Sequence, residues 1–488
     1  MYDIFGCSYA DRSLFTVKIR FYYMEKQFEK HIHFIGCGGI GMFGLALLSI
    51  QHGNSVSGSD IQNNKNSELL NKLGATIYNN HSIDNLPKVE KCTVVYSSAI
   101  SSCNPELIKA KKLGFKCYRR GAFLATLASN YKRVVAIAGS HGKTTVTAMI
   151  SHIMKELLQN KVGYLVGGWP IGEDYPGQMG NGDIFIIEVD ESDLSLELIH
   201  SYIGVVLNLD DDHSWNVGGQ DALDKGFITF ARQSELLIYD KISHLEHLFR
   251  NISSKVKKIS SDDNSTNRLR LNWGVYQNKN AIMAINVAVE LGVPYSDALT
   301  AVLSFEGVER RMCERFNNDQ VIIIEDYAHH PVEIEASISA IRDIYQDRQL
   351  TVIIQPHRYA RLKKYFEEFS KELMKADRVF VLPVFFAWIS DEKKNSNQFI
   401  SQKFTTCTSP KLPVLTQENK NSSAINSKQL VENIGRTAEY VDGSWMNMSK
   451  KIISYSISEN MIYLILGAGD INKLIPALIA DIVDSRFI

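Results

Sequence analysis

The 488-residue sequence has no uninterrupted apolar run near the roughly 18 residues that a membrane-spanning helix needs. It also lacks an excess of either charge, because 53 basic and 54 acidic side chains leave a formal net charge of −1. A chain without a basic surplus has no electrostatic reason to bind nucleic acid or an anionic membrane. We therefore expect neither nucleic acid nor a membrane as a partner.

A Cys-x-x-Cys pair is missing as well. The cysteines are odd in number and scattered along the chain, as Cys7, Cys37, Cys92, Cys103, Cys117, Cys313 and Cys407. Such a set fits reduced thiols in the cytoplasm better than a disulfide framework or a zinc site. Residues 1–30 form a leader of unknown role, which lacks the charged-then-apolar layout of a signal peptide. We expect a cytoplasmic protein.

Short apolar, β-branched runs alternate with amphipathic helical stretches along most of the sequence. This alternation predicts α/β units with mostly parallel sheets, whose ligands sit at the carboxyl ends of the strands. The chain is too long for one hydrophobic core, and we divide it after the leader into residues 31–127, 128–311 and 312–488. The clearest predicted strands are His31–Ile35, Arg133–Ala138, Ile184–Val189, Ile203–Leu207, Val321–Glu325, Leu350–Ile354, Val379–Val384 and Met461–Leu466.

The predicted strand Arg133–Ala138 runs directly into a loop that is typical of nucleotide binding, with an amphipathic helix behind it. The loop consists of Gly139, Ser140, His141, Gly142, Lys143, Thr144 and Thr145. In such a loop, backbone N–H groups attract phosphates, Lys143 reaches the terminal phosphates and Thr144 can hold Mg²⁺. The strict pattern has a glycine where this chain has Ile137. We still predict an ATP site, because an ordinary turn would not call for the Lys-Thr-Thr sequence.

Polar segments follow later predicted strands. Glu188–Asp193 and Asn208–His213 could complete a Mg²⁺ shell around a triphosphate, although either one alone is more typical of solvated surface. In the third unit, Glu325–Pro331 and Gln355–Arg361 stand at strand ends in the same way. Arg358 and Arg361 are three residues apart, so they fit either a shared anion or a structural pair at a helix start.

A glycine motif follows the first predicted strand. It comprises Gly36, Gly38, Gly39 and Gly41, and Asp60 comes nineteen residues after the last glycine. By pattern this is a dinucleotide fingerprint, which would indicate a dehydrogenase. The motif itself encodes only the close approach of a diphosphate to a helix N-terminus. A ligand of the UDP type is therefore at least as plausible as NAD.

With these residues in view, the chain resembles the Mur ligases of bacterial cell-wall synthesis, from His31 to the segment after Asp470. The residues that carry the resemblance are Phe34–Met42, Ser57–Asp60, Ser97–Ile100, Asn104–Glu106, Gly139–Thr145, Glu188–Asp193, Asp212–His213, Glu309–Arg311, Asp326–Pro331 and Gln355–Arg361. The resemblance implies a Rossmann-like N-terminal domain, a central ATPase-type domain with a parallel sheet, and a Rossmann-like C-terminal domain. Within the family the chain is most similar to members that join L-alanine to UDP-N-acetylmuramic acid, with ATP and Mg²⁺.

The resemblance also implies roles for individual residues. Catalytic roles fall on Lys143, His213, Arg358 and Arg361, and metal ligation on Thr144, Glu188 and His213. ATP contacts fall on Gly139, Ser140, His141, Gly142, Lys143, Thr144, Thr145, Asn280, Arg311 and Asp326. Substrate contacts fall on Gly36, Gly38, Gly39, Gly41, Asp60, Ser98, Tyr327, His330, His357 and Arg358. We expect a monomer or a homodimer.

Three features depart from the family pattern. Met283 stands where a second asparagine near the adenine is usual, the segment between Asp262 and Asn272 is short, and Ala387–Ile389 replaces an Ala-Gly-Glu turn. A ligase that adds a preformed peptide is the alternative within the family, and His357 with Arg358 argues against it. A catalytically silent binding protein is a further alternative, which the intact Lys143 opposes.

Overall fold

The computed structural model divides the chain into two compact units, one ending at Glu309 and the other beginning at Arg310. The residues that it describes are 28–211, 214–260, 274–385, 425–456 and 460–484. Most of the leader, the short segment 262–272 and the turn 387–389 lie outside them. No helix within the described ranges is long and apolar enough to cross a membrane.

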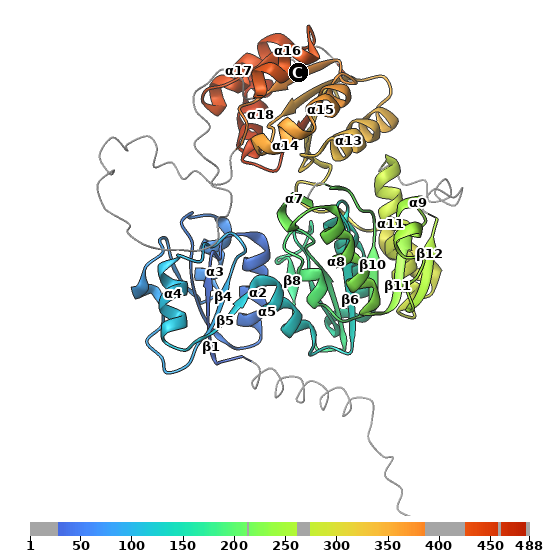
Figure 1. The fold of residues 1–488 in the computed structure, drawn as a ribbon. Helices are drawn as coiled ribbons and strands as arrows, with labels where there is room; N and C mark the ends of the chain where they lie inside the picture. Colours follow the sequence, from blue (N-terminus) through green and yellow to red (C-terminus); the bar gives the residue numbers. More distant parts are fainter. Residues whose placement is uncertain (1–27, 212–213, 261–273, 386–424, 457–459, 485–488) are drawn as a thin grey trace, which may run out of the picture. The chain divides into compact units, whose positions relative to one another are not determined.

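The first sheet has five parallel strands in the order β3-β2-β1-β4-β5, which confirms a Rossmann-like N-terminal domain (Figure 1). The strand order reverses between β1 and β4, so the loops after these two strands lie where such sheets bind ligands. The elements are β1 (His31–Ile35), α2 (Ile40–Gln51), β2 (Ser55–Ser59), α3 (Lys65–Lys72), β3 (Thr76–Tyr78), the 3₁₀ turn η1 (Ile83–Asn85), β4 (Thr93–Tyr96), α4 (Pro105–Lys112), β5 (Lys116–Arg119) and α5 (Arg120–Ala128).

The second sheet has seven strands in the order β12-β11-β10-β6-β9-β7-β8, and only the β7–β8 pair is antiparallel. Strand β6 lies between β9 and β10, so three strands end side by side at the phosphate loop. The elements are β6 (Arg133–Ala138), α6 (Lys143–Leu158), η2 (Gln159–Lys161), β7 (Val162–Leu165), β8 (Gly177–Gln178), β9 (Ile184–Glu188), η3 (Ser195–Leu198), β10 (Ser201–Val206), α7 (Ser214–Val217), α8 (Gln220–Arg232), β11 (Ser234–Asp240), α9 (Ser243–Leu248), β12 (Lys255–Ile259), α11 (Gly274–Glu290) and α12 (Tyr295–Leu303).

These two sheets share one apolar core, in which Phe43 and Phe123 of the first domain pack in the same cluster as Phe185 of the second. Two glycines allow the close approach. A Cβ at Gly44 would lie 2.3 Å from Cδ1 of Leu165, and one at Gly121 would lie 2.2 Å from the Cβ of Ser195. A larger side chain at Gly44 would force the Leu165 side chain to move, and one at Gly121 would force Ser195 itself to shift.

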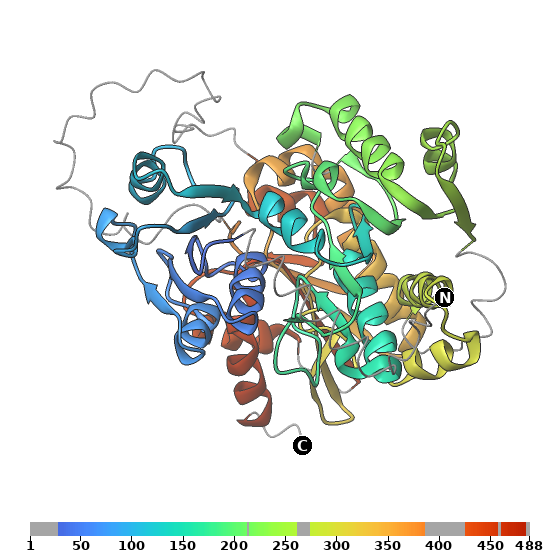
Figure 2. The same cartoon turned by 90° about the horizontal axis from the view of Figure 1, so that it is seen from below.

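The third sheet, in the C-terminal unit, has the order β13-β14-β18-β15-β16-β17, with β13 antiparallel to its neighbour. Apolar clusters cover both of its faces, as in a Rossmann-like domain. Figure 2 shows its last helix, α18 in dark red, near the end of the chain. The elements are β13 (Cys313–Asn317), β14 (Val321–Asp326), α13 (Pro331–Ile344), β15 (Gln349–Ile354), α14 (Tyr359–Lys364), α15 (Phe366–Leu373), β16 (Arg378–Val381), α16 (Ser427–Ile434), β17 (Ala438–Tyr440), α17 (Trp445–Ser456), β18 (Met461–Leu466), η6 (Ile471–Leu474) and α18 (Ile475–Asp484). The predicted three-domain α/β fold is confirmed.

Candidate active site

The phosphate loop is fixed by Asn208, which follows β10. Its side-chain oxygen accepts a hydrogen bond from the backbone N–H of His141 at 2.8 Å, and its amide nitrogen donates to the carbonyl of His141 at 3.0 Å. Gly139 and Gly142 have φ angles of 138° and 84°, which side chains rarely adopt. Ser140 accepts a hydrogen bond from the N–H of Asp210 at 2.8 Å, so the first half of the loop is tied to the segment after β10.

Lys143, the first residue of α6, curls back over this loop. Its ammonium donates to the carbonyl of Gly139, to that of Ser140 at 3.3 Å, and to Oε1 of Glu191 at 2.9 Å. Burial alone would lower the pKa of Lys143, but the charges of Glu191 and Asp190 outweigh it and raise the pKa. Burial raises the pKa of the Glu191 carboxyl to about 7, against the pull of Lys143. Lys143 is therefore a fixed positive charge at the loop.

Thr144 and Glu188 form a second pair at this edge of the sheet. The Thr144 hydroxyl donates to Oε2 of Glu188 at 2.9 Å. A Cβ at Gly167 would lie 1.7 Å from Oε1 of Glu188, so the glycine leaves the space that this carboxylate occupies. A hydroxyl and a carboxylate are hard oxygen donors, which suits Mg²⁺. His213, the third predicted ligand, lies outside the described residues.

Within the described ranges, no three or more His, Cys, Asp or Glu side chains gather as a metal site.

Helix α11 brings Asn280 to the loop. Its side-chain oxygen is 2.9 Å from the position that a Cβ at Gly142 would occupy. Met283, at the departure from the family pattern, is 2% exposed and packs in the apolar core between α11 and the sheet. The two positions thus face different surroundings, and only Asn280 lies beside the phosphate loop.

The glycine motif of the first domain is fixed by polar side chains. The N–H of Gly38 donates to Oδ2 of Asp60 at 2.8 Å, while its carbonyl accepts from the amides of Asn64 and Asn66 at 3.2 and 2.8 Å. In a dinucleotide site, the acidic residue after the second strand would bind a ribose. Here Asp60 holds the loop itself, and this weakens the dehydrogenase interpretation.

The loop after β4 faces the glycine motif. Gly36 has a φ of 80°, and a Cβ there would lie 3.2 Å from the Cβ of Ser97. Ser98, the predicted substrate contact, is the next residue and is exposed in the turn. The structure therefore brings the glycine loop, Asp60 and the Ser97–Ser98 turn to one edge of the sheet.

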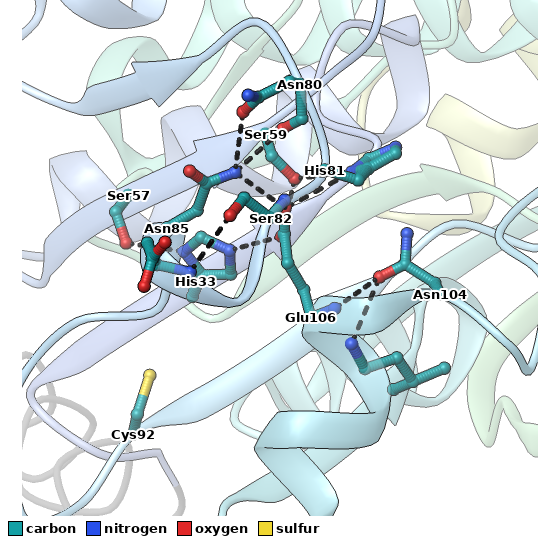
Figure 3. A network of polar contacts seen from close by, with 12 residues as sticks. His33, Ser57, Ser59, Asn80, His81, Ser82, Asn85, Cys92, Asn104 and Glu106 are labelled. Atoms are coloured by element: carbon teal, nitrogen blue, oxygen red, sulfur yellow. Dashed lines mark hydrogen bonds and ion pairs between the residues drawn. The ribbon is translucent and has the colours of Figure 1, made fainter. Parts of the chain in front are cut away.

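Glu106 of α4 lies at the centre of a polar network in the same domain (Figure 3). The carboxylate is fully buried. It accepts hydrogen bonds from Nε2 of His33 at 2.9 Å, Oγ of Ser59 at 2.7 Å, the N–H of Ser82 at 3.0 Å and the amide of Asn85 at 2.8 Å. Burial would raise the pKa of Glu106, but hydrogen bonds with His33, His81 and Ser59 lower it to about 2. Glu106 was not predicted as a site residue, although the Asn-Pro-Glu sequence could have pointed to it.

In the C-terminal unit, aromatic side chains gather beyond the ends of β14 and β15. The ring of His329 lies 5.4 Å from that of Tyr327 and 5.8 Å from that of His357, and Phe385 stacks on His357 at 5.5 Å. The guanidinium of Arg311 lies 4.7 Å from the Tyr327 ring centre. The structure thus brings the predicted residues Tyr327, His357 and Arg311 into one cluster, with His329 as the link.

The adjacent His330 does not join this cluster. It is 4% exposed and packs edge-on against Tyr365 at 4.5 Å, where it precedes helix α13. The sequence pattern His-His-Pro marks both histidines equally. Only the direction of each side chain, set by the helix start, separates His329 from His330.

Arg358 and Arg361 take different positions. Arg358 precedes α14 with a φ of 70°, which is uncommon for a residue with a side chain and is typical of functional sites. Arg361 is 6% exposed, and its Nη1 lies 3.4 Å from Nδ1 of His357. Arg361 therefore contacts His357 rather than standing beside Arg358 on one open surface.

Asp326, at the end of β14, is nearly buried. It accepts hydrogen bonds from the Ser337 hydroxyl at 2.9 Å and from the N–H of Ala328 at 3.1 Å. Burial raises the pKa of its carboxyl to about 6, while the charge of Arg311 opposes the rise. A carboxyl whose pKa is shifted by burial in this way is a candidate for a functional site.

A phosphate loop on a parallel sheet, a diphosphate-type glycine loop on a second sheet and a third Rossmann-like domain define an ATP-dependent ligase of three domains. Family models match the chain in the same order. They are the Mur ligase family catalytic domain over residues 31–132, the Mur ligase middle domain over 137–290 and the Mur ligase glutamate ligase domain over 310–469. This protein belongs to the Mur ligase family.

Curated relatives match three quarters or more of this chain and most of their own length. The UDP-N-acetylmuramate–L-alanine ligase of Sulfurihydrogenibium sp. is 31% identical over 480 residues, which cover 92% of this chain and 97% of the relative. The enzyme of that name from Coxiella burnetii is 33% identical over 401 residues, with 75% and 85% covered. The solved UDP-N-acetylmuramate–alanine ligase of Thermotoga maritima has the same fold, with a TM-score of 0.72, 24% identity and coverage of 93% and 100%.

Proposed function

We propose that this protein is an ATP-dependent ligase that joins L-alanine to the lactyl carboxylate of UDP-N-acetylmuramic acid in peptidoglycan precursor synthesis. The observation that carries the proposal is the phosphate loop, where Lys143 lies over the loop and Thr144 pairs with Glu188. The choice of substrates is supported by relatives of that name at 31% identity over nearly the whole chain.

The N-terminal domain binds the sugar nucleotide in this proposal. Its glycine loop receives the diphosphate at the start of α2, where backbone N–H groups point to an anion. The residues assigned to this ligand are Gly36, Gly38, Gly39, Gly41, Asp60 and Ser98. Because Asp60 holds Gly38, its role is to keep the loop open to the diphosphate.

ATP and its metal occupy the second domain. The residues assigned to ATP there are Gly139, Ser140, His141, Gly142, Lys143, Thr144, Thr145 and Asn280, and those in the C-terminal unit are Arg311 and Asp326. Mg²⁺ would be held by Thr144, Glu188 and His213. When bound, it would neutralise part of the negative charge of the phosphates.

The chemistry requires activation, because a carboxylate is a poor electrophile at neutral pH. A lactyl carboxylate oxygen attacks the γ-phosphorus, and the bond to ADP breaks, which gives an acyl phosphate. The amine of L-alanine then attacks the acyl carbon, loses a proton and expels phosphate as the amide forms. Lys143, kept protonated by Glu191, stabilises the negative charge that builds up on the transferred phosphoryl group.

The amino-acid pocket is assigned to Tyr327, His329, His357 and Arg358. A guanidinium suits the carboxylate of alanine bidentately, and the rings can close around its methyl group. Arg361, which contacts His357, holds that imidazole in place. We leave His330 outside this proposed pocket, because its ring packs against Tyr365.

We also propose that the domains run over residues 31–127, 128–311 and 312–488, and that the protein acts in the cytoplasm as a monomer or a homodimer. The cytoplasm is where its ATP and sugar nucleotide would be supplied. Sedimentation at several protein concentrations would decide between the two oligomeric states.

The test is product formation. The protein is mixed with UDP-N-acetylmuramic acid, ATP, Mg²⁺ and L-alanine, and the sugar nucleotide is analysed by mass spectrometry. The proposal expects a species heavier by one alanine minus one water, together with ADP and phosphate. Sugar nucleotide that stays unmodified while the protein binds both nucleotides would overturn the proposal.

A further inference from the structure

Arg120, the first residue of α5, lies between two sites in different domains. A Cβ at Gly41 of the glycine loop would be 3.4 Å from Nη1 of Arg120. Its other terminal nitrogen, Nη2, lies 2.8 Å from Oδ2 of Asp190 and 3.3 Å from Oδ2 of Asp193, both in the segment after β9. The side chain is 18% exposed, so the two ion pairs are partly desolvated.

That acidic segment also carries the groups that organise the phosphate loop. Asp190 comes two residues after Glu188, the partner of Thr144, and next to Glu191, the partner of Lys143. Asp190 also accepts from the N–H of Ser192 at 2.9 Å. The charge of Arg120 helps to lower the pKa of Asp190, which burial alone would raise.

The shape of the segment therefore depends on a cation from the other domain. Asp193 fixes the next turn as Asp190 fixes its own, because its Oδ1 accepts a hydrogen bond from the N–H of Ser195 at 3.0 Å. Ser195 is also the residue against which Gly121, directly after Arg120, is packed. Arg120 and its neighbour Gly121 thus both contact the segment that runs from Asp190 to Ser195.

We propose that Arg120 is a positioning residue that couples the sugar-nucleotide site to the ATP site, a proposal that rests on the proposed function. A diphosphate on the glycine loop packs beside Arg120 and reduces the freedom of its side chain. The fixed guanidinium in turn holds Asp190 and Asp193, and with them the segment that presents Glu188 and Glu191. Ordering this segment costs conformational entropy. The first ligand that binds orders the segment, so the second ligand binds without that cost. Each ligand therefore raises the affinity for the other by the same factor.

A purely structural ion pair would stabilise the protein without linking the two ligands. The two roles differ in one quantity, the ratio of the dissociation constants for Mg²⁺·ADP without and with saturating UDP-N-acetylmuramic acid. This ratio is measured by calorimetry for the parent, for Arg120→Gln and for Arg133→Gln. Arg133 is a matched control, because it pairs with Asp183 at 2.8 Å in the same unit but at the start of β6, away from the phosphate loop.

The parent and Arg133→Gln should show a ratio of about fivefold or more. Arg120→Gln should reduce it below about twofold while each ligand alone keeps its dissociation constant within roughly threefold. Should Arg120→Gln fail to fold, Asp193→Asn removes the longer of the two ion pairs and should lower the ratio in part. A ratio in Arg120→Gln or Asp193→Asn equal to that of the parent, or a parent without coupling, would overturn the inference. If coupling is absent but the parent still ligates L-alanine, the proposed function stands. A parent that binds neither ligand would overturn both the coupling and the proposed function.

Discussion

The ammonium of Lys143 lies 2.9 Å from Oε1 of Glu191, and the Glu191 side chain is only 1% exposed. A buried ion pair of this kind keeps its geometry because neither charge can be left alone in a dry site. It holds the lysine charged and over the phosphate loop, which the transfer of a phosphoryl group requires. The pair links Lys143, which we propose binds the phosphates, to the same acidic segment that carries Glu188.

Replacing Lys143 with alanine should lower the rate of ligation by more than about a hundredfold, because the charge that faces the transferred phosphate is lost. Binding of UDP-N-acetylmuramic acid should stay near that of the parent, since its site is on the first sheet. Initial rates and calorimetry measure the two effects.

Lys155→Ala serves as the control for this variant. Lys155 belongs to the same helix α6 and pairs with Glu173, so its loss changes the charge of the helix but not the loop. A Lys143→Ala protein that still ligates at a tenth of the parent rate would refute the assignment of the phosphate loop.

The Glu188→Gln substitution should raise the Mg²⁺ concentration for half-maximal activity by about tenfold or more, because an amide is a poorer ligand than a carboxylate. The measurement is a Mg²⁺ titration of the initial rate. Glu173→Gln, which removes a carboxylate that pairs with Lys155, should leave the titration unchanged. If the curve of Glu188→Gln superimposes on that of the parent, Glu188 does not bind the metal.

The sequence predicted strands well where a buried β-branched run ends in a polar segment. Three strands have the predicted bounds, namely His31–Ile35, Arg133–Ala138 and Met461–Leu466. Apolar runs of this length are typical of strands that are buried on both faces of a parallel sheet. Strand Val379–Val384 ends earlier, at Val381, since the chain turns towards Pro383 and pairing with β17 stops.

The candidate site was harder to predict than the fold. Which of two neighbouring histidines lies beside His357 depends on how α13 begins, so the pattern could not separate His329 from His330. The ion pairs of Arg120 could not be predicted from the sequence either. Its partners Asp190 and Asp193 are about seventy residues away in the sequence and belong to another domain. Long-range ion pairs of this kind become visible only in the folded chain.

Amino-acid choice should depend on Arg358 and His357. Arg358→Ala should raise the Michaelis constant for L-alanine far more than that for ATP, because in the proposed pocket the guanidinium binds the carboxylate of alanine. His357→Ala should widen the accepted range of side chains, since the ring is then missing from the pocket. Glycine and serine should react with the parent at a penalty of about 1–3 kcal/mol, as small apolar pockets discriminate weakly.

The two Michaelis constants of each variant decide this point. Equal losses for alanine and ATP in Arg358→Ala would place that arginine on the phosphates instead. His330→Ala is the matched comparison, because His330 neighbours the pocket residue His329 in sequence but packs against Tyr365. It should lower stability without changing the preference among amino acids.

Glu106→Gln should reduce the free energy of unfolding at pH 7 by roughly 1–3 kcal/mol, because a charged acceptor of several buried hydrogen bonds is replaced by a neutral amide. The depressed pKa, about 2, means that Glu106 stabilises the fold fully above the ordinary glutamate pKa of about 4.3. This contribution is lost as the pH falls from there towards 2.

Urea unfolding at pH 7, 4 and 3 measures both effects. The difference between the parent and Glu106→Gln should shrink as the pH falls, whereas the exposed Glu90→Gln should match the parent throughout. A difference that stays constant down to pH 3 would show that Glu106 is not ionised in the folded protein.

The central claim is tested most directly by phosphate release from ATP in the presence of UDP-N-acetylmuramic acid and one amine at a time. The amines are L-alanine, glycine, serine, leucine and the preformed peptide L-alanyl-γ-D-glutamyl-meso-diaminopimelate. We predict the highest kcat/KM for L-alanine, lower values for glycine and serine, and no release with leucine or the peptide. Preferred use of the peptide, or release that does not depend on any amine, would contradict the account.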